Sequence, residues 1–227
     1  YETACLNHGF HCPQLLLTAG DLRAHGRHKN AINCIDALLG SGVLPVINEN
    51  DSVSVDEIRF GDNDTLAALV ASMIRADLTI LLTSVDGMHL REGDSWGERI
   101  SVVEKVTPEV RAMAGATDGN PFSVGGMTSK LKAAEVLARA GDPLIVADGR
   151  DFAMINRILA GEDVGTLFPA TAATRMRGRR RYVAFFSNPK GELVVDEGAV
   201  RALRDKGRSL LPSGIRDVRR TFESGVT

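Results

Sequence analysis

The chain has 227 residues, of which 44% are hydrophobic and 25% are charged, with a formal net charge of -2. This composition is ordinary for a globular protein and allows one large domain, or a medium domain with a small one. It excludes a membrane-spanning segment, because no apolar run approaches the roughly 18 residues that a spanning helix needs. Three cysteines are too few and too irregular for a secreted disulfide scaffold, so we expect reduced thiols and a cytoplasmic protein.

Positive charge is concentrated near the carboxyl end. Residues 175–220 hold 13 Lys and Arg against 5 Asp and Glu, whereas acidic residues dominate elsewhere. The run "TAATRMRGRRRYV" ends the helix-like periodicity and precedes an apolar stretch that resembles a strand. We therefore predict a first domain over 1–170, a basic linker over 171–181 and a second domain over 182–227.

Helix-like and strand-like segments alternate along the first domain, which predicts an α/β fold with a largely parallel sheet flanked by helices. The spacing of Ile32, Ile35 and Leu38 predicts one apolar helix face, and "LTILLT" reads as a strand buried on both sides. Thr107 and Pro108 are typical of a helix start. The expected helices lie within residues 1–11, 30–42, 61–77, 107–115 and 125–141, and the expected strands lie within 13–18, 43–50, 78–83 and 143–149.

Polar clusters follow the predicted strands or open the predicted helices, where α/β sheets bind ligands. They are "NENDSV", "GDND", "LLTSVDG" and "SVGGMTSK". The first and third could be simple turns, since Asn, Asp and Gly favour turns. A helix cap would explain one residue of "GDND", for example Asp64, but three consecutive polar residues exceed what capping requires.

The octet "SVGGMTSK" carries the strongest single signal. Two glycines permit close backbone approach, Thr128 and Ser129 offer hydroxyls, and a helix starting here would direct free N–H groups at an anion that Lys130 also attracts. The spacing differs from the P-loop pattern GxxxxGK[ST]. A glycine turn with an exposed lysine is the alternative.

Taken together and in order, several blocks resemble glutamate 5-kinases, a group within the amino acid kinase family. The blocks are "LPVINENDSV", "FGDNDTLAALVA", "LLTSVDGMH", "GGMTSKLKAA" and "VGTLF". The resemblance implies an amino acid kinase-like α/β sandwich lacking its amino-terminal strands, followed by a partial β-rich PUA-like domain. A "KxG"-type glycine loop and an "SGA"-like turn of the family are absent, so we expect the chain alone to be inactive. Position 84 is Ser, where many relatives have Asp.

The resemblance implies phosphoryl transfer from ATP to the side-chain carboxylate of L-glutamate, the first step of proline biosynthesis. It assigns catalytic roles to Lys130, which would neutralise the phosphoryl group, and to Asp62, which would orient lysines. Asp51, Asn63 and Asp64 would bind the substrate or support its pocket. The implied ATP site consists of Thr83, Ser84, Val124, Gly125, Gly126, Met127, Thr128, Ser129 and Lys130.

The resemblance also implies ATP with Mg²⁺ as its counter-ion, proline as a feedback inhibitor and a homo-oligomer, with no membrane partner. A related kinase acting on another carboxylate is an alternative. RNA binding through the basic run, which holds Arg175, Arg177, Arg179, Arg180 and Arg181, is another, although a solvated linker explains the same arginines.

Two further sets of residues have blander explanations. Cys5, His8, His11 and Cys12 could suggest zinc, but their spacing lacks the separated pairs of structural zinc motifs. His25, His28 and His89 are expected to be solvated rather than acid–base catalysts, because a carboxylate nucleophile is already ionised.

Overall fold

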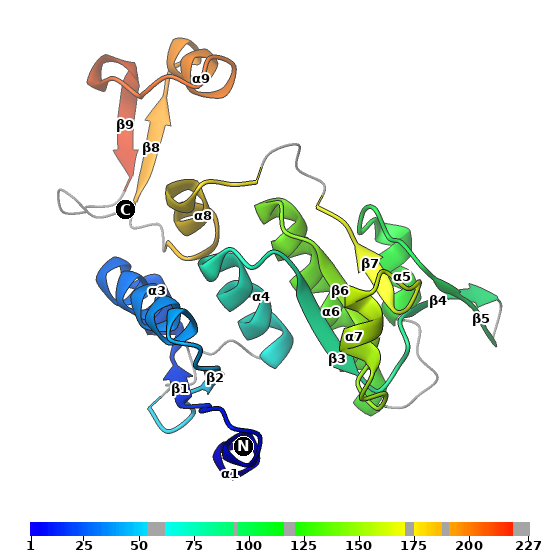
Figure 1. Ribbon diagram of the computed structural model, residues 1–227. Coiled ribbons are helices and arrows are strands. Elements are labelled where there is room, and N and C mark those ends of the chain that lie inside the picture. Colours follow the sequence, from blue (N-terminus) through cyan, green and yellow to red (C-terminus); the bar gives the residue numbers. More distant parts are fainter. Residues whose placement is uncertain (54–61, 93–94, 116–120, 171–174, 188–190, 220–227) are drawn as a thin grey trace. The chain divides into compact units, whose positions relative to one another are not determined.

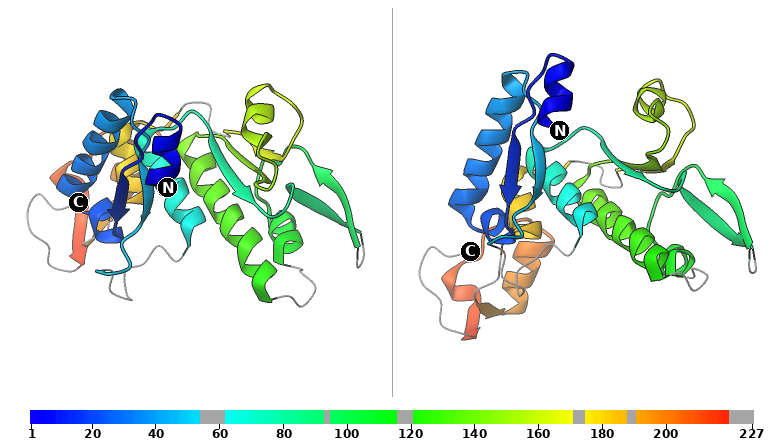
Figure 2. Two further views of the ribbon diagram at one scale, coloured as in Figure 1. Left: turned by 60° about the horizontal axis from the view of Figure 1, so that its bottom comes forward. Right: turned by 90° about the horizontal axis from the view of Figure 1, so that it is seen from below.

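The computed structural model describes residues 1–53, 62–92, 95–115, 121–170, 175–187 and 191–219. The chain divides into two compact units, Tyr1–Phe186 and Ser187–Thr227, and each is described by itself. Figures 1 and 2 show the elements from three directions. Within the described ranges, no helix combines the length and apolar character needed to cross a membrane.

The first unit alternates helices and strands, as the sequence predicts. Its elements are α1 (Glu2–Asn7), β1 (Gln14–Leu17), α2 (Ala19–Arg23), α3 (His25–Gly40), β2 (Val46–Glu49), α4 (Asn63–Ile74), β3 (Thr79–Thr83), β4 (Met88–Glu92), β5 (Ser95–Ile100), α5 (Pro108–Gly115), α6 (Pro121–Ala140), β6 (Leu144–Asp148), α7 (Met154–Leu159), β7 (Thr166–Phe168) and α8 (Gly178–Phe185).

Among the described residues of this unit, two strand pairs are parallel and two are antiparallel. β1 pairs in parallel with β2, and β3 pairs in parallel with β6, whose other edge carries antiparallel β7. These pairings confirm the predicted α/β class. Among the described residues β2 and β3 are not paired with each other, and α4 lies between the two sheets in Figure 1 and contacts both strands.

Helix α4 contributes to two apolar cores, because its apolar residues are not confined to one narrow stripe. Leu66, Val70 and Met73 pack with residues of β1, α2, α3 and α8. Ala68 and Ala71 pack with β3, α6 and β6. Small side chains on the second face permit the close packing of α4 on α6, which leaves α4 fixed from both sides.

Two predictions about strands need correction. Strand β3 is not buried on both faces: Leu81 is buried, but the neighbouring Leu82 is 48% exposed. The antiparallel hairpin of β4 and β5 was not predicted, because its short strands carry polar and charged residues rather than a clear apolar alternation.

Helix α6 starts earlier than the sequence predicts. The expected start was at Gly125, whereas the helix begins at Pro121, a residue that suits a first helical turn. Gly125 and Gly126 therefore lie inside the helix. The free N–H groups of its first turn belong to residues before Thr128 and Lys130, so the predicted anion-binding helix start at those residues is wrong.

The expected strand after the arginine run is also wrong, because residues 178–185 form helix α8. Tyr182 and Phe186, four residues apart, lie on one helix face and are buried against α3 and α4. Arg181 is 2% exposed and donates hydrogen bonds to Asp142, which is 1% exposed. The first unit thus extends to Phe186, beyond the predicted boundary at residue 170.

The second unit contains an antiparallel pair, β8 (Glu192–Val195) and β9 (Ile215–Arg219). Helix α9 (Glu197–Arg204) and the 3₁₀ turn η1 (Pro212–Gly214) connect them. Asp196 caps α9 by accepting a hydrogen bond from the Ala199 N–H at 2.8 Å.

Candidate functional site

The two carboxylates at the start of α4, Asp62 and Asp64, make different contacts. Asp62 is the N-cap, and its Oδ1 accepts a hydrogen bond from the Thr65 N–H at 2.6 Å. Asp64 lies in the first turn, and its side chain points instead to α6. The sequence suggested Asp64 as the cap and Asp62 as the partner of a lysine, and the observed contacts are the reverse.

Lys130 is the cation that α6 brings to this cluster. Its Nζ lies 2.9 Å from Asp64 Oδ2, and the two side chains are 11% and 20% exposed. The Ser129 hydroxyl lies within hydrogen-bond distance of the same carboxylate oxygen and of the Gly126 carbonyl, at 2.9 Å from the latter, and its single proton is shared between these two acceptors. The expectation of an exposed lysine does not hold, because Lys130 is one of the buried charged residues.

Asn63 and Asp51 are more open to solvent than this ion pair. Asn63 is exposed and lines two adjacent grooves beside β2, of about 460 and 490 Å³. Asp51 is exposed in the turn after β2. Their positions place a carboxylate and an amide within the same α/β segment, which joins β2 to α4.

A second polar cluster lies where parallel strands β3 and β6 end. Thr83 is half-buried and Ser84 is exposed, and the Thr83 carbonyl accepts a hydrogen bond from the Gly149 N–H at 2.7 Å. At the end of β6, Arg150 donates to both carboxylate oxygens of Asp148. That contact lowers the pKa of Asp148 to about 2, so the strand ends carry a fixed carboxylate–guanidinium pair.

His89 and Asp86 form a pair beside these strand ends that the sequence reading missed. The His89 Nε2 lies 2.7 Å from Asp86 Oδ1, and its Nδ1 lies 2.9 Å from the Gly97 carbonyl. Since both ring nitrogens face acceptors, the charged imidazolium is favoured. The hydrogen bond with Asp86 raises the pKa of His89, and the same bond lowers the pKa of Asp86.

The close packing behind this pair requires glycine at position 87. Gly87 has φ +150°, and a Cβ there would lie 2.5 Å from Thr166 Oγ1. That hydroxyl accepts a hydrogen bond from the Met88 N–H at 2.8 Å and donates to the Ile100 carbonyl at 2.7 Å. The glycine of "LLTSVDG" therefore has a packing role that joins β4 to β7.

The structure brings some of the predicted site residues together. Asp64, Ser129 and Lys130 are in direct contact, and Asp62 and Asn63 adjoin Asp64 in the chain. Among the described contacts, no hydrogen bond or ion pair joins Lys130 to the strand-end or turn residues of the prediction, which are Asp51, Thr83 and Ser84. Val124, Gly125, Gly126, Met127 and Thr128 lie in α6 before Ser129.

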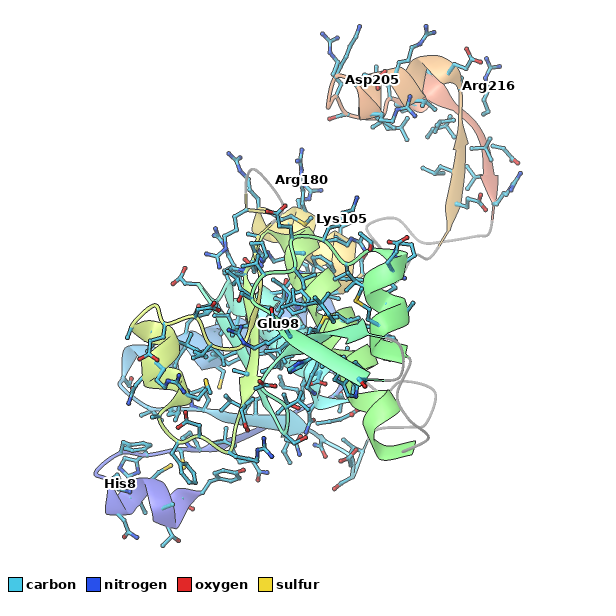
Figure 3. All side chains as sticks on the ribbon, turned by 90° about the vertical axis from the view of Figure 1, so that its right-hand side faces the viewer. His8, Glu98, Lys105, Arg180, Asp205 and Arg216 are labelled. Atoms are coloured by element: carbon cyan, nitrogen blue, oxygen red, sulfur yellow. The ribbon has the colours of Figure 1, made fainter. Side chains whose placement is uncertain are left out.

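Some histidines and arginines lie in more buried environments than the sequence predicts. His28 is buried rather than solvated, since its ring packs 4.9 Å from Tyr182 and 4.5 Å from Phe186, measured between ring centroids. Arg180 extends from the surface of α8 in Figure 3. Arg175 and Arg181, by contrast, both contact Asp142, so these two guanidinium groups serve the fold.

Within the described parts of the chain, no group of three or more His, Cys, Asp or Glu side chains is placed to hold a metal ion. Cys5, His8, His11 and Cys12 are among these described residues.

A model of the amino acid kinase family matches residues 1–148, and a PUA domain model matches residues 191–227. The chain belongs to the amino acid kinase family. The matched regions fall within the first and second units, respectively.

Curated relatives that match almost the whole chain are named glutamate 5-kinase. The glutamate 5-kinase of Trichlorobacter lovleyi is 45% identical over 228 residues, covering 99% of this chain and 60% of the relative. That of Deinococcus radiodurans is 43% identical over 229 residues, covering 100% of this chain and 62% of the relative. The chain thus spans about 60% of the length of these relatives. The UMP kinase of Bacillus anthracis matches 77% of this chain and 64% of its own at 14% identity, with a TM-score of 0.47.

Proposed function

We propose that the first unit takes part in ATP-dependent phosphorylation of the side-chain carboxylate of L-glutamate. The observation that carries this proposal is the buried Lys130–Asp64 pair, in a chain 45% identical over 228 residues to a glutamate 5-kinase. In the reaction, a carboxylate oxygen of glutamate forms a bond to the γ-phosphorus as the bond from that phosphorus to the bridging oxygen of ADP breaks. The products are γ-glutamyl phosphate and ADP.

Lys130 supplies the positive charge that phosphoryl transfer needs. The transferring group spreads negative charge over its oxygens, so a fixed cation stabilises the transition state more than any nucleophile of the protein could. Asp64 holds the ammonium group in one place before the substrate arrives, and Ser129 contacts the same carboxylate oxygen. No base is required, because the acceptor carboxylate is already ionised.

The remaining predicted residues divide between the two substrates. Asp51 would pair with the ammonium group of glutamate, and Asn63 would donate to one of its carboxylates. Thr83 and Ser84 would contact the nucleotide from the end of β3. Asp62 would act indirectly, since its observed bond to Thr65 fixes the first turn of α4, and with it the position of Asp64.

Mg²⁺ fits this site as a partner of the nucleotide phosphates. Asp64 is bound to Lys130 and Asp62 to the backbone, and no cluster of three acidic, Cys or His ligands occurs among the described residues. Mg²⁺ commonly retains several waters and binds through phosphates with few protein ligands. When bound with ATP, it would neutralise charge on the phosphates, and Lys130 would act beside it.

Nucleotide binding by the purified chain tests the role of Lys130. We expect Lys130→Met to weaken binding of Mg²⁺–ATP about tenfold, which corresponds to loss of one charge-assisted contact. Lys132→Met is the matched control, because Lys132 is exposed on the same helix two residues away. Equal affinities of the two variants, measured by calorimetry, would remove Lys130 from the nucleotide site.

Substrate class is tested by hydroxamate formation. The chain is combined with the segments of the Trichlorobacter lovleyi relative that it does not match, and ATP-dependent trapping by hydroxylamine is compared for glutamate, aspartate and N-acetylglutamate. Of the three acids, we expect glutamate to be the one that supports ATP-dependent turnover. Preference for either of the other acids would assign the site to the alternative, a related kinase with a different carboxylate substrate.

Proline inhibition and a homo-oligomer remain proposals of the family resemblance. The segment "DSVSVDEIRF", residues 51–60, is a candidate participant in proline inhibition, and its residues 54–60 lie outside the described residues. Inhibition of the hydroxamate assay by proline, and the mass of the purified chain by light scattering, test the two proposals separately.

A further inference from the structure

Helices α4 and α6 pack side by side and are cross-linked by polar contacts at two places. One cross-link is the ion pair between Asp64 of α4 and Lys130 of α6. The other is Arg181, which donates to the Ser72 carbonyl of α4 at 2.9 Å and to the Ala140 carbonyl of α6 at 3.0 Å. The candidate site and the carboxyl ends of the two helices are therefore joined by the same pair of elements.

The two cross-links lie at matching levels of the helices. Helix α4 ends at Ile74 and α6 ends at Ala140, so Asp64 and Lys130 each lie ten positions before the last residue of their helix. At a rise of 1.5 Å per residue, this spacing places both side chains about 15 Å from the helix ends. Since the helices run in the same direction, a shift of one along the other changes both cross-links together.

The interface between the two cross-links has shallow side chains on its α4 side. The described residues that α4 contributes to the core shared with α6 are Ala67, Ala68 and Ala71. Packed helices fix their register when the side-chain ridges of one enter the grooves of the other. Alanine ridges are low, so the apolar interface specifies the register weakly and the polar contacts at its ends supply the rest.

The carboxyl ends of α4 and α6 meet at a cluster that we call the Asp142 junction, which consists of Asp142, Arg175 and Arg181. Arg181 donates to both oxygens of the buried Asp142, and the Arg175 Nε donates to one of them at 2.6 Å. Arg175 also donates to the carbonyls of Arg75 and Ala76, which follow α4. The last carbonyls of a helix lack intrahelical partners and carry partial negative charge. The two guanidinium groups satisfy such carbonyls and the carboxylate at once.

Both arginines come from a part of the chain that neither family model matches. The kinase match ends at residue 148 and the PUA match begins at residue 191, and Arg175 and Arg181 lie between them. Helix α8, which carries Arg181, nevertheless packs on α4. This intervening segment thus holds two helices of the matched kinase region.

We propose that the Asp142 junction positions Lys130, with Arg181 as the main positioning residue. By holding the carboxyl ends of α4 and α6 together, the junction sets the register at which Lys130 meets Asp64, about 15 Å away along α6. The effect on the ammonium group does not depend on the proposed function, whereas its effect on phosphoryl transfer rests on it. Misplacing a catalytic group by about 1 Å costs up to about a hundredfold in rate.

The reactivity of the Lys130 amine tests this proposal without any substrate. Arg181→Lys keeps the charge, but one ammonium group cannot reproduce the contacts of a planar guanidinium with two helices and both oxygens of Asp142. Brief acetylation of the purified chain is read by mass spectrometry as the ratio of Lys130 to Lys132, which is exposed on the same helix. We expect Arg181→Lys to raise this ratio about threefold or more by local opening.

Arg180→Lys is the matched control, because Arg180 is exposed on the same helix α8. The acetylation ratio of this variant should equal that of the parent. A ratio that Arg181→Lys also leaves at the parent value would overturn the proposal.

A second control separates register from general loss of stability. Ile158→Ala removes a buried side chain of α7 from a core cluster whose described members include none from α4 or α6. It should leave the acetylation ratio unchanged when all chains are compared well below their melting temperatures. A rise as large as that of Arg181→Lys would mean that the ratio reports stability alone, and the positioning role would be lost.

A double-mutant cycle on Mg²⁺–ATP binding tests whether Arg181 acts through Lys130. We expect Arg181→Lys to weaken binding about threefold in the parent and to have no further effect in the Lys130→Met chain. Equal weakening in both backgrounds would contradict the positioning role. If the parent and Lys130→Met bind the nucleotide equally, the proposed role of Lys130 in nucleotide binding fails, while the acetylation ratio still decides the positioning role.

Arg175→Lys provides the test if Arg181→Lys does not fold. The Arg175 side chain is 28% exposed, so its replacement disturbs the core less. We expect a rise of about twofold in the acetylation ratio, because the ends of α4 and α6 lose one of their two guanidinium contacts. An unchanged ratio would count against the junction as the positioning device.

Discussion

Asp64 and Lys130 carry opposite charges in a position with little access to water, so each depends on the other. Replacing Asp64 by Asn leaves the ammonium group without its counter-charge, and we expect a loss of about 3 kcal/mol in the free energy of unfolding. The side chains are 20% and 11% exposed, so solvent screening is modest. Urea unfolding with an unchanged m value is the measurement.

A double variant separates the missing charge partner from simple loss of contact. Asp64→Asn combined with Lys130→Met removes both charges, and most of the lost stability should return. If the single and double variants are equally destabilised, the stranded ammonium group is not the cause.

His28 and His89 should give stability opposite dependence on pH. Burial lowers the pKa of His28 from its ordinary 6.5, so the unfolded state takes up protons first; the stability associated with His28 is present above pH 6.5 and is lost as pH falls. The pKa of His89 is raised from 6.5 by Asp86 and the Gly97 carbonyl. Its contribution is present below pH 6.5 and is lost as pH rises through the raised value.

Unfolding measured between about pH 5 and about pH 8 checks both signs. The destabilisation that His28→Gln causes relative to the parent should be smaller at the acid end of this range than at the alkaline end. The destabilisation that His89→Gln causes should be smaller at the alkaline end. Imidazole NMR titration gives the pKa values directly. A His28 pKa above that of His89 would contradict the assigned environments.

Helix α8 is held by one buried guanidinium as well as by aromatic packing. Arg181 contacts Asp142, the Ser72 carbonyl and the Ala140 carbonyl. We expect Arg181→Leu to reduce the free energy of unfolding by about 3 kcal/mol, because among the described residues Asp142 would keep a single ion-pair partner, Arg175.

The neighbouring arginine of the same helix provides the control. Arg180 is exposed, and Arg180→Leu should change the free energy of unfolding by no more than about 0.5 kcal/mol. Similar effects of the two substitutions would mean that α8 is held by its apolar face alone. Both are read from urea unfolding of the purified chain.

The same helix explains why element prediction failed near the carboxyl end of the first unit. A run of arginines normally marks a solvated surface, and the sequence alone does not reveal that Arg181 meets Asp142, which lies 39 residues earlier. Helices with regular apolar spacing, such as α3 and α4, were predicted because their periodicity is local. The β4–β5 hairpin was missed because its pairing, not its composition, makes it a strand pair.

At the level of the whole molecule, we expect that the chain can be cut at the boundary between the two units with little loss of stability. A chain ending at Phe186 keeps α8 and all of the first core, so its melting temperature should fall by less than about 3 °C. A chain ending at Arg177 loses Arg181, Tyr182 and Phe186 and should melt more than about 10 °C lower. Calorimetry of both truncated chains tests this, and equal melting temperatures would place the boundary before α8.

The candidate site was predictable only as a set of segments. Sequence order and motif identified "GDND" and "GGMTSK" as polar clusters, and the structure joins them through Asp64, Ser129 and Lys130. The contact spans 66 positions between Asp64 and Lys130, so local pattern could not show which acid meets the lysine. The assignment required the packing of α4 on α6.

Asn63 belongs both to the polar cluster at the start of α4 and to the lining of the grooves beside β2. It opens the helix that carries Asp64, and it lines both grooves beside β2. If a ligand in either groove steadies this end of α4, it will tighten ligand binding at Asp64 and Lys130, and thermodynamic reciprocity requires the second ligand to tighten the first by the same factor. Occupancy of the groove and occupancy of the site would then be linked by one coupling free energy.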